Sequence, residues 1–188
     1  MKHQLDHRLR LLATALLLSG TLLTCLFSCK KEEIPEDPVK GVVLTVSVSV
    51  PQAVLDVADI AVSMRTPYAL ETKSVDETKW VYHFEVAEPS GASPMPVHVD
   101  VSVKGREMEK GNEIFAGLRY AFSFDTVFES GAEEHIASFE KNVSGRIIWI
   151  SSERRYGSFE PFNYAWRGEM KAAPKSPAKY IVEELILE

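Results

Sequence analysis

The chain has 188 residues, with 21 basic and 27 acidic side chains and a formal net charge of −6 at pH 7. This length suits one folded domain with a sizeable buried core. The acidic balance argues against nucleic acid, or an anionic membrane surface, as a binding partner.

The N-terminal segment has the layout of a secretory signal peptide. Residues 1–10 carry a short basic head, and residues 11–28 form an uncharged, mostly apolar run that ends in a small residue. We therefore expect residues 1–28 to be removed. The run is just long enough to cross a bilayer as a helix, so an uncleaved N-terminal helix is the alternative.

The stretch LFSC at residues 26–29 resembles the lipobox of bacterial lipoproteins. The resemblance implies that Cys29 takes the lipid and that Cys25 leaves with the signal peptide. Lys31, Glu32 and Glu33 resemble the surface-export signal of Bacteroidetes lipoproteins. Together these motifs imply an outer-membrane lipoprotein exposed at the cell surface, with a periplasm-facing orientation as the alternative. Its mature chain would keep no thiol for a disulfide, for catalysis or for a metal.

Residues 29–40 are rich in charge and proline and contain no aromatic side chain. This composition is typical of an extended tether without packed structure. We expect residues 41–188 to form one domain beyond it.

The domain is dominated by apolar side chains at every second position, as half-buried strands require. The clearest cases are residues 42–50, 79–86, 97–103 and 120–128, and further candidates are 59–65 and 145–151. Turn-forming residues separate them at 89–96, 103–112 and 172–178. The pattern predicts an all-β fold, an antiparallel β-sandwich of the immunoglobulin or transthyretin kind.

Two segments are ambiguous. Residues 177–188 show both helical and strand spacing, and their β-branched content favours a strand. Residues 129–140 are the place where one short helix fits.

Two polar pairs suggest a metal site: His83 with Glu85, and His98 with Asp100. If their strands form a hairpin with Val86 opposite Val97, the two imidazoles and two carboxylates share one sheet face and are able to hold zinc or a similar cation. The alternative is that the pairs only decorate a solvent-facing sheet. No other cofactor is expected.

The segment 149–168 combines aromatic and arginine side chains. Aromatic rings with neighbouring donors suit sugar rings and protein interfaces, so we consider five residues as a ligand-binding set: Trp149, Arg154, Arg155, Tyr156 and Trp166. The alternative is that the rings fill the core and the arginine stems cover them.

Common catalytic motifs, such as GxSxG, HExxH and GxxxxGK[ST], do not occur in the sequence. We therefore expect no catalytic residues and a non-catalytic, lipid-anchored component of a fimbria-like or adhesive surface assembly. This function requires a protein partner that covers an open strand edge or an apolar patch. A carbohydrate-binding accessory protein is the second hypothesis, and a hydrolase or metalloenzyme that uses His83, Glu85, His98 and Asp100 is the third. The sequence does not identify the ligand, the partner or the oligomeric state.

Overall fold

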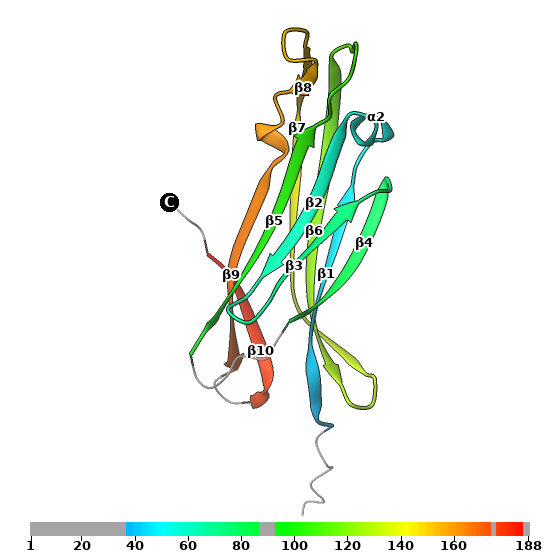
Figure 1. Cartoon of the computed structure of the whole chain (residues 1–188). Coiled ribbons are helices and arrows are strands. Elements are labelled where there is room, and N and C mark those ends of the chain that lie inside the picture. Colours follow the sequence, from blue (N-terminus) through cyan, green and yellow to red (C-terminus); the bar gives the residue numbers. More distant parts are fainter. Residues whose placement is uncertain (1–36, 87–92, 174–175, 186–188) are drawn as a thin grey trace, which may run out of the picture. The chain divides into compact units, whose positions relative to one another are not determined.

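Strands make up most of residues 37–86, 93–173 and 176–185, the part of the chain that the computed structural model describes (Figure 1). The predicted signal peptide, the lipidated Cys29 and the export residues Lys31, Glu32 and Glu33 lie outside the described residues. The first strand begins at Val39, shortly before the predicted domain boundary at residue 41.

Two antiparallel sheets contain the strands. Sheet A has the order β4-β1-β6-β7-β8 and sheet B the order β10-β9-β5-β2-β3. The strands of sheet A are β1 (Val39–Ser49), β4 (Lys79–Val86), β6 (Ile114–Phe128), β7 (Glu133–Ile150) and β8 (Arg155–Gly157). Those of sheet B are β2 (Ala58–Arg65), β3 (Leu70–Val75), β5 (Met95–Gly105), β9 (Tyr164–Ala173) and β10 (Ser176–Glu184). The prediction of an all-β sandwich is confirmed.

The two ambiguous segments are both extended. Residues 176–184 form β10, and residues 133–140 belong to β7, so the short helix expected at 129–140 was misplaced. The described ranges instead contain α2 (Gln52–Leu55) and a 3-10 turn, η1 (Glu160–Phe162). No helix there reaches the length and apolarity that a membrane span requires.

The core forms where the inward rows of the two sheets meet. In β1 every second side chain from Val42 to Val48 is buried, because successive side chains of a strand point to opposite faces. Trp166 of β9 packs among the rings of sheet A, with ring centroids 5.3 Å from Phe124 and 5.0 Å from Phe139. Such tilted aromatic contacts add to the stabilisation from buried area.

Tyr120 joins sheet A to the η1 turn. Its ring is fully buried in β6, and its hydroxyl donates a hydrogen bond of 2.5 Å to the Phe162 carbonyl oxygen. Burial raises the pKa of the Tyr120 hydroxyl well above its usual range. Next to it, the Val103 backbone N–H donates to the Asn163 side-chain oxygen at 2.8 Å. The two bonds fix the η1 turn against both sheets.

We expect Tyr120→Phe to lower the free energy of unfolding by about 1–2 kcal/mol, because the buried Phe162 carbonyl loses its donor. Urea denaturation measures the change. Tyr82→Phe is the matched control: its hydroxyl bonds the partly exposed Glu71 carboxylate at 2.8 Å, so its loss should cost less. Equal effects of the two variants would contradict this role of Tyr120.

Candidate functional site

The four residues considered for metal binding do not meet. The predicted hairpin was wrong: β4 pairs with β1, where Val86 lies opposite Val42, and β5 pairs with β2 and β9. The chain changes sheets between β4 and β5. The core therefore separates two pairs: His83 and Glu85 on sheet A, and His98 and Asp100 on sheet B. The described residues contain no group of three or more His, Cys, Asp or Glu side chains suited to a metal ion.

Each pair instead has local partners. His83 Nδ1 lies 2.9 Å from the Thr45 hydroxyl on the neighbouring strand. Asp100 accepts a hydrogen bond of 2.7 Å from the Arg167 guanidinium, which also forms an ion pair with it. Burial lowers the pKa of His98, and the positive charge of Arg167 lowers it further. These contacts are those of polar residues on the outer faces of two sheets.

The aromatic segment supplies core rather than an exposed platform. Trp166 is fully buried and Tyr156 is 6% exposed, so the prediction that these rings are available to a ligand was wrong. The physical reason is alternation: Trp166 lies on the inward row of β9. Trp149 is partly buried, whereas Arg154 is exposed in the turn from β7 to β8 and Arg155 is exposed at the start of β8. Arg155 is paired with Glu153 at 2.6 Å.

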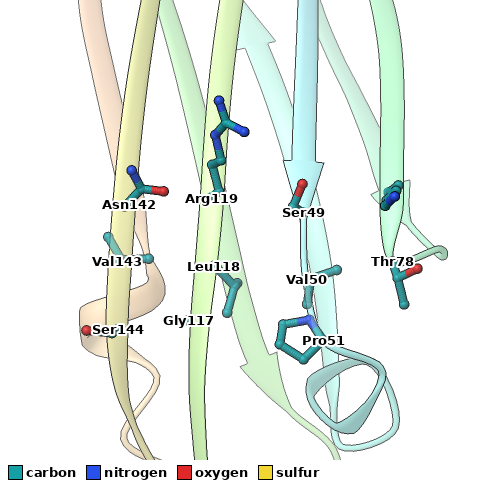
Figure 2. Close-up of a pocket in the computed structure, with 11 residues that line it drawn as sticks. Ser49, Val50, Pro51, Thr78, Gly117, Leu118, Arg119, Asn142, Val143 and Ser144 are labelled. Atoms are coloured by element: carbon teal, nitrogen blue, oxygen red, sulfur yellow. The ribbon is translucent and has the colours of Figure 1, made fainter.

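The outer face of sheet A carries two hollows. One hollow of about 560 Å³ lies across β1, β6 and β7. Figure 2 shows Arg119 and Asn142 extending from adjacent strands at one end of it and Pro51 beside α2 at the other. A second hollow of about 300 Å³ lies further along the same three strands, lined in part by Thr45, Ser123 and Ser138. Hydroxyl groups in both are able to bind polar ligands.

The most distinctive surface is an open edge of β7. On one side β7 pairs with β6 from Glu133 to Ile147, and on the other it pairs with β8 only from Ile148 to Ile150. Within the described part of the chain no strand is hydrogen-bonded to the second edge of residues 133–147, although β10 and the η1 turn approach β7. We call these residues the β7 open edge. Unpaired strand edges are templates for the strand of another chain.

Two backbone hydrogen bonds at the end of β6 indicate which N–H and C=O groups of β7 point to the open edge. The Phe128 N–H bonds to the β7 side and the Glu129 N–H to the β1 side. Because this direction alternates along a strand, even-numbered residues of β6 bond to β7. Phe139, the partner of Phe122, therefore bonds to β6. The neighbouring even-numbered residues of β7 direct their N–H and C=O groups outward: Ser138, Glu140, Asn142, Ser144 and Arg146.

The side chains beside the β7 open edge form a mixed inner row. Ala137, Phe139 and Val143 are partly buried and pack against the core. Lys141 lies among them, opposite the fully buried Tyr120. A charged side chain on the inward row of an edge strand discourages unspecific pairing with other strands. The main-chain groups of the edge are therefore accessible to another strand, whereas the side chains restrict which strands fit.

Comparison with known proteins adds no relative: protein-family models, curated proteins and solved structures each gave no match to the chain. Sequence reasoning anticipated open strand edges in general. It did not identify β7, because its neighbours are fixed by topology rather than by local pattern.

We expect Trp166→Ala to destabilise the domain by about 3–5 kcal/mol, because it leaves a large cavity between β9 and sheet A. Thermal or urea denaturation measures the loss. Arg155→Ala, at an exposed position of the same segment, should change the free energy of unfolding by less than about 0.5 kcal/mol. A Trp166→Ala protein as stable as the parent would restore the exposed-platform hypothesis.

Proposed function

We propose that this protein is a lipid-anchored component of a cell-surface assembly, and that it joins a protein partner through the β7 open edge. The single observation that carries the proposal is that, within the described part of the chain, the second edge of the long strand β7 has a strand partner only at residues 148–150. Attachment to the outer membrane through a lipid on Cys29, and exposure at the cell surface, remain the expectation from residues 26–33; a periplasm-facing orientation is the alternative.

Strand addition suits this edge better than the other edges of the sandwich. The outermost strands β3, β4 and β10 have 6, 8 and 9 residues, whereas β7 has 18. An added strand along residues 133–147 would span roughly 45–50 Å at the usual rise per residue. Its main-chain hydrogen bonds would supply affinity, and alternate side chains would supply specificity.

Lys141 defines part of that specificity. Its position in the strand belongs to the inward row although its side chain is exposed, and a partner strand would place its own inward side chains beside Ala137 and Phe139. A fitting partner strand carries apolar residues next to these positions and an acidic or hydrogen-bonding residue next to Lys141. Strands without that match leave a charge unpaired as the edge is covered, which disfavours them.

The carbohydrate-binding alternative has lost its main support. Stacking on a sugar requires an accessible ring face, and the rings of Tyr156 and Trp166 are buried. The exposed Arg154 and Arg155 provide donors but no platform.

The proposal is tested by changing one residue of the open edge. Asn142→Pro removes an N–H that points outward, so the β6–β7 ladder keeps its bonds while an added strand loses one. We expect the variant to fold and to lose most of its partner in crosslinking on intact cells followed by pull-down and mass spectrometry. Asn142→Ala removes the same side chain but keeps the N–H, and should retain the partner.

Location is checked with a photoreactive amino acid. Placed at residue 144 on the open edge, it should capture one defined protein, whereas placed at Ser102 on the outer face of sheet B it should not. Capture from both positions, or full retention of the partner by a folded Asn142→Pro protein, would contradict assembly through β7.

A further inference from the structure

Three polar side chains on the outer face of sheet A form a linear hydrogen-bonded array. The Asp125 carboxylate lies 2.9 Å from His135 Nδ1, and His135 Nε2 lies 3.0 Å from the Ser138 hydroxyl oxygen. Asp125 belongs to β6, and His135 and Ser138 belong to β7. The order carboxylate, imidazole, hydroxyl is that of a nucleophilic serine site.

A β-bulge creates this arrangement. In a regular strand, residues three apart point to opposite faces, so His135 and Ser138 would be separated. Here Phe124 pairs with Ala137 and Asp125 pairs with His135, which leaves Ile136 as an extra residue in β7. The extra residue restores both side chains to the outer face. Bulges of this kind commonly re-aim side chains beside functional sites.

The hydrogen bonds fix the imidazole tautomer. An ionised carboxylate only accepts hydrogen bonds, so His135 Nδ1 carries the proton and donates to Asp125. His135 Nε2 then presents a lone pair, to which the Ser138 hydroxyl donates. Ser123 donates to the second carboxylate oxygen of Asp125 at 2.9 Å and holds it in place. The array is thus oriented for removal of the Ser138 proton.

The surroundings are accessible and small. The His135 side chain is 55% exposed, and Ser138 lines the hollow of about 300 Å³ together with Thr45, Ser47 and Glu140. The Ser138 backbone N–H is directed to the β7 open edge and is therefore available to a developing oxyanion. Glu140, which also lines the hollow, forms an ion pair with Arg119 at 2.6 Å, so its charge is balanced by a neighbour.

We infer that Ser138 is the nucleophile of an acyl-transfer site, with His135 as general base and Asp125 as positioning residue, and that it takes small esters. The inference does not rest on the proposed assembly function, although both use the outward N–H of Ser138. It departs from the expectation of a non-catalytic protein.

The steps balance without a further reactant except water. Ser138 Oγ bonds to the ester carbonyl carbon while its proton passes to His135 Nε2, and the carbonyl electron pair moves to oxygen. Collapse of this adduct breaks the bond to the alkoxide, which leaves with the proton from His135. Water repeats the sequence on the acyl-Ser138 and releases the carboxylic acid.

The test is covalent labelling of the purified full-length chain with a fluorophosphonate, followed by peptide mass spectrometry, alongside hydrolysis of p-nitrophenyl acetate. We expect one label per chain, on Ser138, and none in Ser138→Ala. His135→Gln should slow labelling by about 100-fold, the usual contribution of a general base. Asp125→Asn, which disturbs the tautomer, should slow it by at least about tenfold.

Ser102→Ala, on the outer face of sheet B, is the control and should label like the parent. Circular dichroism and melting curves establish that each variant is folded. Failure of the parent chain to label, labelling at another residue, or equal rates for the parent and a folded His135→Gln protein would each overturn the inference.

Discussion

The long antiparallel pairing of β6 with β7 is the interaction on which the rest of the structure depends. β6 bonds to β1 on one side and to β7 on the other, so it forms the centre of sheet A. Its inward row, Tyr120, Phe122 and Phe124, is the surface on which Trp166 and the η1 turn pack. β7 extends along almost the whole of β6, and within the described residues its far edge has a strand partner only at Ile148–Ile150. The core, the position of the η1 turn and the open edge therefore all depend on β6 and its pairing with β7.

Side-chain alternation predicted β1, β2, β4 and β5, and in β1 the residues expected inside are the buried ones. It did not predict β3, β9 or the first half of β7. Pairing could not be predicted from it, because an alternating strand fits any antiparallel neighbour equally well. β4 and β5 are consecutive but lie in different sheets, so the two His–acid pairs considered for a metal site are not close together. Trp166 shows the same limit, since a turn-rich segment gave no sign of its inward direction. The array of Asp125, His135 and Ser138 could not be predicted from the sequence for a different reason. His135 and Ser138 are three residues apart, and only the β-bulge at Ile136 puts their side chains on the same face of the sheet.

Two features of β7 lie side by side and use different groups. Its open edge offers main-chain donors and acceptors in the plane of the sheet, whereas His135 and Ser138 project from the outer face. A strand added at the edge would occupy the outward N–H of Ser138 while leaving the imidazole and hydroxyl exposed. The same residue would thus take part in both arrangements through different atoms, and occupancy of the edge would alter the electrostatic environment of the hydroxyl.

The position of β1 has a mechanical consequence. β1 starts at Val39, next to the proposed tether, and lies between β4 and β6 with antiparallel ladders on both sides. Tension between a lipid in the membrane and a load on the domain would pull β1 along its own axis. In that direction the bonds of both ladders share the force and have to break together, whereas an outermost strand peeled sideways gives way one bond at a time. The order of strands in sheet A thus places the most force-resistant connection at the point where the chain would be held.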